Sequence, residues 1–160
     1  MSKTLKVKYL NHNCKLEIHG DFIDLKAAET ITFTKNNEYR AIPLGVCIEL
    51  PKHFIAKTVP RSSTYKRFRI IQSNSIGIID YNYKGDNDQW FLPVVHFRKR
   101  EDSTCIIKEG DRIAQFEIMP SQFAPWWVKL NWIFSSKIKI VEVSKLGNNN
   151  RGGLGSTNTK

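Results

Sequence analysis

Residues 74–85 read NSIGIIDYNYKG, a stretch in which a short apolar run ends directly in a carboxylate. Ile78 and Ile79 favour a strand, and Gly85 is typical of the end of a β-hairpin. A charge at the edge of a buried strand is costly unless something uses it. Asp80 is therefore either a residue that caps the following turn, Gly85–Asp88, or an acid on a rigid wall that faces a site.

On both sides of this stretch, short runs rich in Ile, Val, Phe and Thr alternate with turn residues. The runs are predicted to be strands at 30–34, 41–50, 68–72, 89–97, 112–119 and 137–143. Apolar and polar residues alternate cleanly in the last of them, so one face of that strand is expected to be wet. Many short strands at this spacing indicate an all-β sandwich, jelly roll or barrel.

Residues 125–136 break the strand pattern. Pro125 opens the segment, and its apolar residues follow the spacing i, i+4, i+7 and i+8, which predicts a short amphipathic helix inserted between two strands. The residues of this face are Trp126, Leu130, Ile133 and Phe134. Trp127 and Trp132 either cap the core, which we favour, or cover a partner.

The length of 160 residues predicts one domain, and the net charge of +10 requires an explanation. Nucleic acid, a small polyanion such as a nucleoside triphosphate, and a solvated basic surface all fit this charge. The three cysteines form no CxxC pair, which favours reduced thiols and a cytoplasmic location. No run approaches the roughly 20 apolar residues of a membrane span, and no signal peptide is recognised, so no membrane partner is expected.

Three further stretches have a composition suited to phosphate. Pro60–Ser63 offers a guanidinium and two hydroxyls, residues 110–115 (GDRIAQ) end in an amide, and residues 151–157 (RGGLGST) combine glycines with hydroxyls. Alone, each is typical of an ordinary turn or of a frayed tail. The last lies in a polar C-terminal region that cannot fold by itself.

Together and in this order, these stretches resemble the five motifs of the trimeric deoxyuridine triphosphatases (dUTPases). The counterparts are GDFIDLKAAE (20–29), PRSSTYKRFRI (60–70), NSIGIIDYNYKG (74–85), GDRIAQ (110–115) and RGGLGST (151–157). The wording of the first motif and the tryptophan-rich insertion look most like phage or bacterial members. The resemblance implies one jelly-roll domain over residues 1–147 and a flexible C-terminal arm over 148–160.

The same resemblance implies a homotrimer that hydrolyses dUTP to dUMP and pyrophosphate with Mg²⁺. Its active sites would lie at subunit interfaces, with the arm of one subunit closing a site formed by the other two. Mg²⁺ would be held by the triphosphate and waters, with no direct protein ligand. The location would be the cytoplasm, that of the host if the chain is phage-encoded. Nucleic acid is then not an expected partner, whereas an additional protein partner at 125–136 is a further hypothesis.

Roles for single residues follow from the matched positions. Asp80 would be the general base that takes a proton from the water attacking the α-phosphorus. Backbone groups along residues 74–79 would read uracil, and the ring of Tyr83 would press on the deoxyribose and reject a 2′-hydroxyl. Asp24 would have a structural or supporting role. The predicted substrate-binding residues are Arg61, Ser62, Ser63, Asn74, Gly77, Ile79, Tyr83, Gln115, Arg151, Gly153, Leu154, Gly155, Ser156 and Thr157.

Three positions depart from the family pattern. Leu154 stands where a phenylalanine usually stacks on uracil, and the arm motif is two residues shorter than usual after Arg151. Arg69 stands where the second motif commonly ends in glycine. Two alternatives stay open: a dCTP deaminase of the same fold and a basic β-rich nucleic-acid-binding module. The spacing Asp80-x-x-Tyr83 favours phosphate chemistry over the deaminase, and a nucleic-acid-binding module would not need an acid at position 80.

Overall fold

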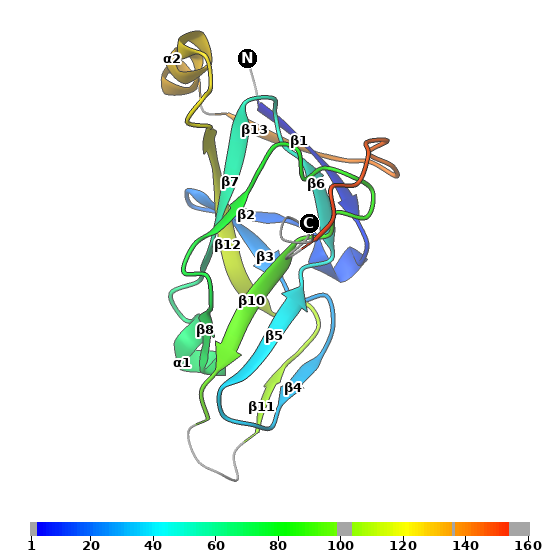
Figure 1. Cartoon of the computed structure of the whole chain (residues 1–160), viewed down its shortest axis with the longest axis vertical. Helices are drawn as coiled ribbons and strands as arrows, with labels where there is room; N and C mark the ends of the chain where they lie inside the picture. The colour runs from blue at the N-terminus through cyan, green and yellow to red at the C-terminus, as the bar shows by residue number, and fades with distance from the viewer. Residues whose placement is uncertain (1–2, 99–103, 136, 154–160) are drawn as a thin grey trace, which may run out of the picture.

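The computed structural model of this chain describes residues 3–98, 104–135 and 137–153 (Figure 1). Its largest sheet has the order β2-β3-β12-β7-β9 and consists of β2 (Glu17–His19), β3 (Phe22–Lys26), β12 (Arg112–Pro120), β7 (Phe54–Pro60) and β9 (Gly77–Ile79). A second sheet is formed by β13 (Ile138–Glu142), β1 (Lys3–Tyr9) and β6 (Val46–Glu49). In it, β1 and β13 run parallel.

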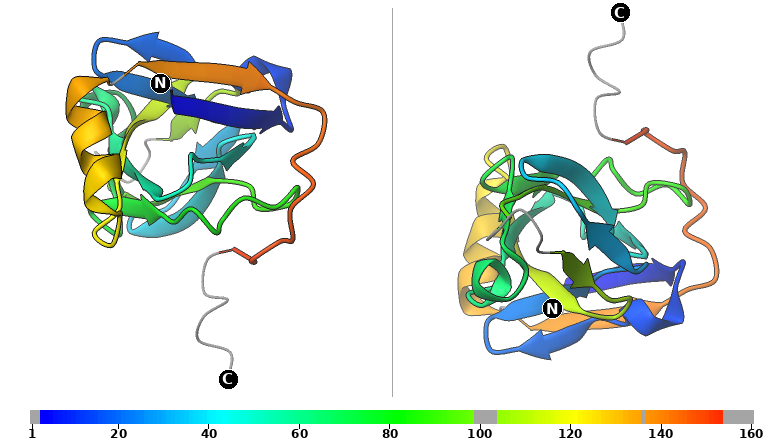
Figure 2. Two further views of the ribbon diagram at one scale, coloured as in Figure 1. Left: turned by 90° about the horizontal axis from the view of Figure 1, so that it is seen from above. Right: turned by 90° about the horizontal axis from the view of Figure 1, so that it is seen from below.

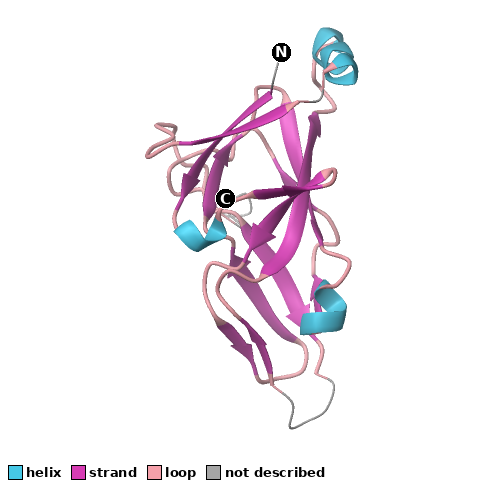
Figure 3. Cartoon of the chain, turned by 180° about the vertical axis from the view of Figure 1, so that it is seen from behind, coloured by secondary structure: helices cyan, strands magenta, loops and turns pink. Residues whose placement is uncertain are grey.

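Two smaller sheets complete the strands. One is formed by β5 (Glu38–Pro43), β10 (Phe91–His96) and β8 (Ile70–Gln72), and the other by β11 (Cys105–Ile107) and β4 (Ile31–Phe33). The helices within the described residues lie at the periphery of the strands (Figure 3); they are η1 (His12–Cys14), α1 (Thr64–Phe68) and α2 (Trp126–Phe134). The predicted all-β class is therefore confirmed. No helix of the described residues is long and apolar enough to cross a bilayer.

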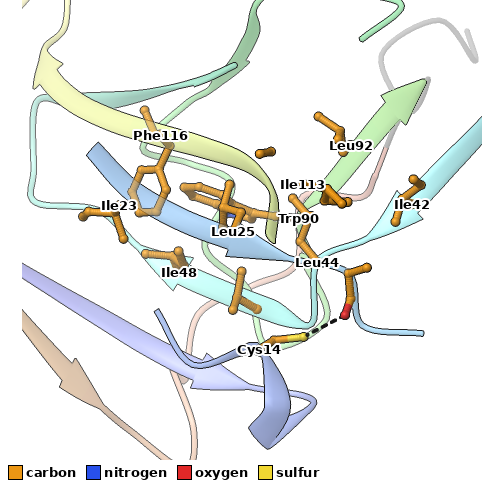
Figure 4. Packing of buried hydrophobic residues seen from close by; sticks show 14 of the residues in the cluster. Cys14, Ile23, Leu25, Ile42, Leu44, Ile48, Trp90, Leu92, Ile113 and Phe116 are labelled. Atoms are coloured by element: carbon orange, nitrogen blue, oxygen red, sulfur yellow. Dashed lines mark hydrogen bonds between the residues drawn. The ribbon is translucent and has the colours of Figure 1, made fainter. Parts of the chain in front are cut away.

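The core lies between the sheets and is centred on Trp90 (Figure 4). Trp90 packs edge-on against Phe116 of β12, with ring centroids 5.1 Å apart, and both side chains are fully buried. Leu25 of β3 and Ile48 of β6 join the same cluster. This packing fixes β12, the strand that carries Gln115, against the rest of the molecule.

Replacing Phe116 with alanine should lower the free energy of unfolding by about 3–5 kcal/mol, since it removes a fully buried ring and leaves a cavity. Chemical denaturation would measure this loss as a lower midpoint concentration of denaturant. The slope of the unfolding free energy against denaturant concentration should stay unchanged. The matched control is Phe123→Ala, because Phe123 is 89% exposed and its removal opens no cavity. A similar loss in both variants would contradict the assignment of the core.

Several predicted element boundaries were wrong. The run 41–50 is two strands in different sheets, because the chain turns at Gly45, which has a φ of +66° and no room for a Cβ beside Cys14. In the run 68–72, Phe68 ends α1 and Arg69 takes a left-handed φ of 53°, so that only Ile70–Gln72 is a strand. Arg69 thus adopts the conformation for which the family glycine is suited.

The expectation of a β-hairpin over residues 74–85 is also wrong. β9 pairs with β7 (Gly77 opposite Thr58, Ile79 opposite Ala56), and no strand follows it before β10. Residues 80–83 form a turn in which the Tyr83 N–H donates to the Asp80 carbonyl at 3.0 Å. Asp80 therefore lies at the end of an edge strand of the five-stranded sheet.

The predicted helix is present as α2, but its apolar face is not where the spacing placed it. Trp126, Ile133 and Phe134 are 71%, 75% and 80% exposed, whereas Trp132 packs edge-on against Phe54 of β7 at 5.3 Å. The Lys3 ammonium donates to the Asn131 side chain and fixes the helix to β1. Of the two tryptophans considered, Trp132 caps the core and Trp127 is 58% exposed.

Candidate functional site

Asp80 presents its carboxylate to solvent from a well-fixed backbone. Its side chain is 52% exposed, while the preceding Ile79 packs against the hydrophobic core. The turn to Tyr83 fixes the residue on its other side. Ile78, which precedes Ile79, is 53% exposed, so the apolar run before Asp80 is buried on one side only. A cavity of 460 Å³ adjoins Asp80, lined by Lys52, His53, Phe54, Ile55, Asp80, Tyr81, Asn82, Ser121 and Phe123.

The residues before Asp80 are held by β7. Gly77 is buried, and a Cβ there would lie 2.1 Å from the Thr58 hydroxyl oxygen, so close packing requires the glycine. The Gln72 amide donates to the Thr58 carbonyl at 3.2 Å and to the Asn74 side-chain oxygen at 2.9 Å. Asn74 is thereby tied to β7 while its own side chain is exposed.

Tyr83 lies on the same turn with its ring half-buried. Its hydroxyl donates to the Gln89 carbonyl at 2.7 Å. Burial, together with the nearby Asp88, raises the pKa of Tyr83 to about 12. The phenol therefore stays protonated at neutral pH and keeps this hydrogen bond, which fixes the orientation of the ring.

Residues from the C-terminal end lie directly on this turn. An Arg151 guanidinium nitrogen is 2.6 Å from an Asp80 carboxylate oxygen, with the two side chains 42% and 52% exposed. A Cβ on Gly153 would lie 3.8 Å from the Tyr83 hydroxyl. The structure thus brings together Asp80, Tyr83, Arg151 and Gly153. The predicted residues Leu154, Gly155, Ser156 and Thr157 lie outside the described residues.

A second group of predicted residues is built around Asp24 of β3. This carboxylate is 2% exposed and forms salt bridges with two guanidinium groups. The Arg61 Nε lies 3.0 Å from one carboxylate oxygen, and an Arg112 guanidinium nitrogen lies 3.5 Å from the other. Gln115 of β12 is opposite Asp24 in the sheet register. A buried carboxylate paired in this way orients the guanidinium of Arg61, whose side chain is 24% exposed.

Ser62 and Ser63 follow Arg61 in the loop before α1. Thr64, which is buried, accepts from the Arg61 backbone N–H at 3.1 Å and donates to the Ile113 carbonyl of β12 at 2.8 Å. These bonds pin the loop beside β12, two residues from Gln115. Ser62 is exposed there, and its hydroxyl is available to a ligand.

The two groups lie at opposite ends of β7. Asp80 follows Ile79, which is opposite Ala56, whereas Arg61 follows Pro60 at the far end of the strand. About six strand residues therefore separate Asp80 from Arg61, which corresponds to about 20 Å at the usual rise per residue. A ligand that contacted both groups within one chain would have to extend along most of β7.

Sequence reasoning missed Asp86 and Asp88, which it treated as turn residues. Asp88 is 1% exposed, and its carboxylate accepts backbone N–H groups of Gly85, Arg151 and Gly152 at 2.8–3.0 Å. Asp86 accepts those of Leu146 and Gly147 at 2.9 and 3.0 Å. The sequence signal that could have revealed these contacts is the pair of aspartates in Gly85-Asp86-Asn87-Asp88, since a tight turn needs no more than one.

The dUTPase family model matches residues 21–125 of this chain. The SPbeta prophage-derived deoxyuridine 5'-triphosphate nucleotidohydrolase of Bacillus subtilis is 46% identical over 160 residues, covering 98% of this chain and 99% of the relative. The deoxyuridine 5'-triphosphate nucleotidohydrolase of Neorickettsia sennetsu is 31% identical over the full length of both.

Among solved structures, the dUTPase of Streptococcus mutans superposes with a TM-score of 0.63 at 23% identity, covering 73% of this chain and 93% of that one. The dUTPase of Staphylococcus bacteriophage 80alpha gives 0.62 at 20% identity, covering 76% and 92%. A mutant dUTPase of phage phi11 of S. aureus, for which the coordination of a structural Mg(II) ion is described, superposes with a TM-score of 0.61 at 20% identity, covering 76% of this chain and 93% of that one. These similarities confirm the predicted jelly-roll fold.

Proposed function

The chain belongs to the dUTPase family, and from that membership we propose that it hydrolyses dUTP to dUMP and pyrophosphate with Asp80 as the general base. One observation supports this assignment most strongly. The half-exposed Asp80 carboxylate lies at the end of an edge strand, next to Tyr83 and the Arg151 guanidinium. An acid and an aromatic ring thus lie on one turn, with a cation in contact with the acid.

Asp80 would accept a proton from a water aimed at the α-phosphorus, in line with the departing pyrophosphate. Its backbone is fixed on both sides, so the carboxylate oxygen is placed before substrate arrives. Arg61, Ser62, Ser63 and Gln115 would donate to the phosphate oxygens. Donors already in position when negative charge develops contribute strongly to the rate.

The separation of about 20 Å along β7 supports a site shared between chains. We propose that Asp80 and Tyr83 of one subunit act on a triphosphate held by Arg61, Ser62 and Gln115 of another. Three such interfaces in a closed ring make a homotrimer, the arrangement that the resemblance implies. Asp24 would keep its supporting role, because its buried carboxylate holds the Arg61 side chain.

Mg²⁺ would be bound by the triphosphate itself. The described residues contain no cluster of three or more His, Cys, Asp or Glu side chains suited to a metal ion. In many nucleotide sites, Mg²⁺ keeps several of its waters and binds phosphate oxygens of the substrate. When bound, the ion would neutralise charge on the phosphates.

Base recognition would use the free edge of β9. One edge of this strand pairs with β7. The other edge is unpaired among the described residues, because β9 is the outermost strand of its sheet. The backbone groups on the unpaired side of β9 would be available to the polar edge of uracil. Cytosine presents the reverse pattern at position 4 and would leave buried groups unpaired, at about 1–3 kcal/mol each.

We expect pyrophosphate release from dUTP alone when dUTP, dCTP, dTTP and UTP are each supplied with Mg²⁺. Poor pairing disfavours dCTP, the methyl group excludes dTTP, and Tyr83 leaves no room for the 2′-hydroxyl of UTP. A coupled pyrophosphate assay measures all four substrates. Equal release from dUTP and dCTP would contradict the reading of the base. Ammonia release from dCTP would support the deaminase alternative instead.

The cellular setting is proposed from the thiols. Cys14, Cys47 and Cys105 are all unpaired. Burial raises the pKa of Cys47 to about 11, so this thiol stays protonated and unreactive. Reduced, inert thiols fit a cytoplasmic enzyme.

A further inference from the structure

Gln72, the last residue of β8, is a polar side chain buried beside the start of β9. It is 4% exposed, and its amide nitrogen donates to the Thr58 carbonyl at 3.2 Å and to the Asn74 side-chain oxygen at 2.9 Å. Its own amide oxygen has no hydrogen-bond partner among the described residues. A buried acceptor left unpaired is costly, and an apolar side chain of similar size would avoid that cost. Packing alone therefore does not explain a glutamine at this position.

The Thr58 carbonyl fixes the direction of both hydrogen bonds. A backbone carbonyl can only accept, so the NH2 group of Gln72 must face it. The same NH2 group donates to the side-chain oxygen of Asn74, which leaves the Asn74 NH2 group as the end of that amide available to a ligand. The Asn74 side chain is exposed, and none of the described residues accepts from its NH2 group. We refer to the Thr58 carbonyl and the two side-chain amides as the relay.

The relay lies next to the strand edge that we propose reads the base. The chain turns back tightly after Gln72, where the Ser75 N–H donates to the Gln72 carbonyl at 3.3 Å and Ser75 takes a left-handed φ of 59°. A Cβ on Gly77, the first residue of β9, would lie 3.3 Å from the Gln72 amide nitrogen. The relay therefore adjoins the start of β9, whereas Asp80 follows its end.

Both hydrogen bonds of the relay are made between residues 58 and 74 of one chain. The described C-terminal residues leave the strands elsewhere, after β13, which lies beside β1 (Figure 2). The orientation of the Asn74 amide is therefore set by β7 and β8, independently of the C-terminal arm.

We propose that Gln72 is a positioning residue for selection of the base, because it holds the Asn74 NH2 group toward the carbonyl oxygen at position 4 of uracil. This inference rests on the proposed function and deepens it. Cytosine carries an amino group at position 4, so a fixed NH2 group would meet a second donor and no hydrogen bond would form. An Asn74 amide free to rotate would accept from cytosine as readily as it donates to uracil. The relay thus makes the site select against dCTP.

Replacing Gln72 with methionine keeps the length of the side chain and removes both donated hydrogen bonds. Isothermal titration calorimetry with α,β-imido analogues of dUTP and dCTP measures selection without turnover. In Gln72→Met, the preference for the dUTP analogue, given as the ratio of the two dissociation constants, should fall by about 5- to 150-fold. An unchanged ratio would overturn the role of Gln72.

Asn74→Ala shows whether Gln72 acts through Asn74. The Asn74 side chain is exposed, so its removal opens no cavity in the core. This variant should lose the same part of the preference, and adding Gln72→Met to it should cause no further fall, because the two residues act as a unit. A second fall of similar size in the double variant would show that Gln72 acts by another route and would overturn the proposal.

His96→Phe is the matched control for loss of a buried polar group. His96 is 2% exposed, its Nδ1 lies 3.2 Å from the Lys35 carbonyl, and it pairs with Ile70 at the other end of β8. This variant should melt at a lower temperature and keep the wild-type ratio of dissociation constants. If it loses as much preference as Gln72→Met, the effect is general destabilisation and the proposal is overturned.

Turnover of the wild-type protein tests the proposed function separately. Selective binding of the dUTP analogue that falls in Gln72→Met, without release of pyrophosphate from dUTP, would contradict hydrolysis but support the role of Gln72. Release of pyrophosphate from dUTP together with an unchanged ratio in Gln72→Met would overturn only the positioning role.

Discussion

The variant Asp80→Asn is expected to lose dUTP turnover by about 10²- to 10⁴-fold, the range usual for removal of a general base. Asparagine has nearly the same shape as aspartate and can accept a hydrogen bond from water, but it cannot take up the proton. The Asp80 backbone is held by β9 and by the turn to Tyr83, so the fold should be unaffected. The loss should appear in kcat, measured by pyrophosphate release under saturating dUTP.

A matched control separates this effect from a general loss of charge. Glu117→Gln also removes one carboxylate, but from an exposed position of β12 that the proposed site does not use. It should retain wild-type kcat. Binding of a non-hydrolysable dUTP analogue should persist in Asp80→Asn, because the proposed contacts to base and phosphate are made by other residues. Retained turnover in Asp80→Asn would exclude Asp80 as the base.

The interaction with Arg151 has a consequence for substrate binding. The Arg151 guanidinium is 2.6 Å from the Asp80 carboxylate. The guanidinium is therefore in direct contact with the carboxylate that is proposed to act as the base. Incoming phosphates offer Arg151 a more highly charged partner. The contact therefore keeps Arg151 close to where a triphosphate would bind, and the ligand itself would free Asp80.

Class and order of elements were predictable because they depend on local patterns. Turn residues between short β-branched runs indicated the all-β fold, and Pro125 correctly marked the start of α2. The failures came from tertiary contacts. The run 41–50 looks like one strand, but Gly45 packs against Cys14 and the chain changes sheet there. Helical spacing predicted that the face of α2 with Trp126, Leu130, Ile133 and Phe134 would be buried. In the structure, Trp132 on another face packs against Phe54 instead.

The proximity of some candidate site residues was predictable for a different reason. Residues such as Asp80 and Tyr83 occur at fixed spacing on a single turn, and a linear pattern can detect that. The grouping of Arg61 with Asp24 depends on pairing between β3, β12 and β7, which no local pattern reveals. The contacts of Asp88 with Arg151 and Gly152 were missed because these partners lie more than 60 positions away in the sequence.

Deleting residues 148–160 should reduce dUTP turnover by at least about 10²-fold while leaving the oligomer intact, by analogy with loss of a fixed charge-stabilising donor. Among the described residues, the last strand is β13, which ends at Glu142, so deletion of 148–153 removes no sheet hydrogen bond. Asp88 loses the Arg151 and Gly152 N–H groups, but removal of the segment opens its carboxylate to water. Stability should therefore change little. Size-exclusion chromatography and thermal melting measure these two properties.

A shorter deletion shows which part of the arm is required. Removing residues 158–160 leaves every predicted site residue in place, including Thr157, and should retain turnover. Arg151→Ala in the full-length chain should give an intermediate loss, because the backbone bonds to Asp88 persist while the guanidinium beside Asp80 is removed. If the long deletion retains full turnover, the arm has no role in catalysis. If all three variants are equally inactive, the loss reflects misfolding, which the melting curves would reveal independently.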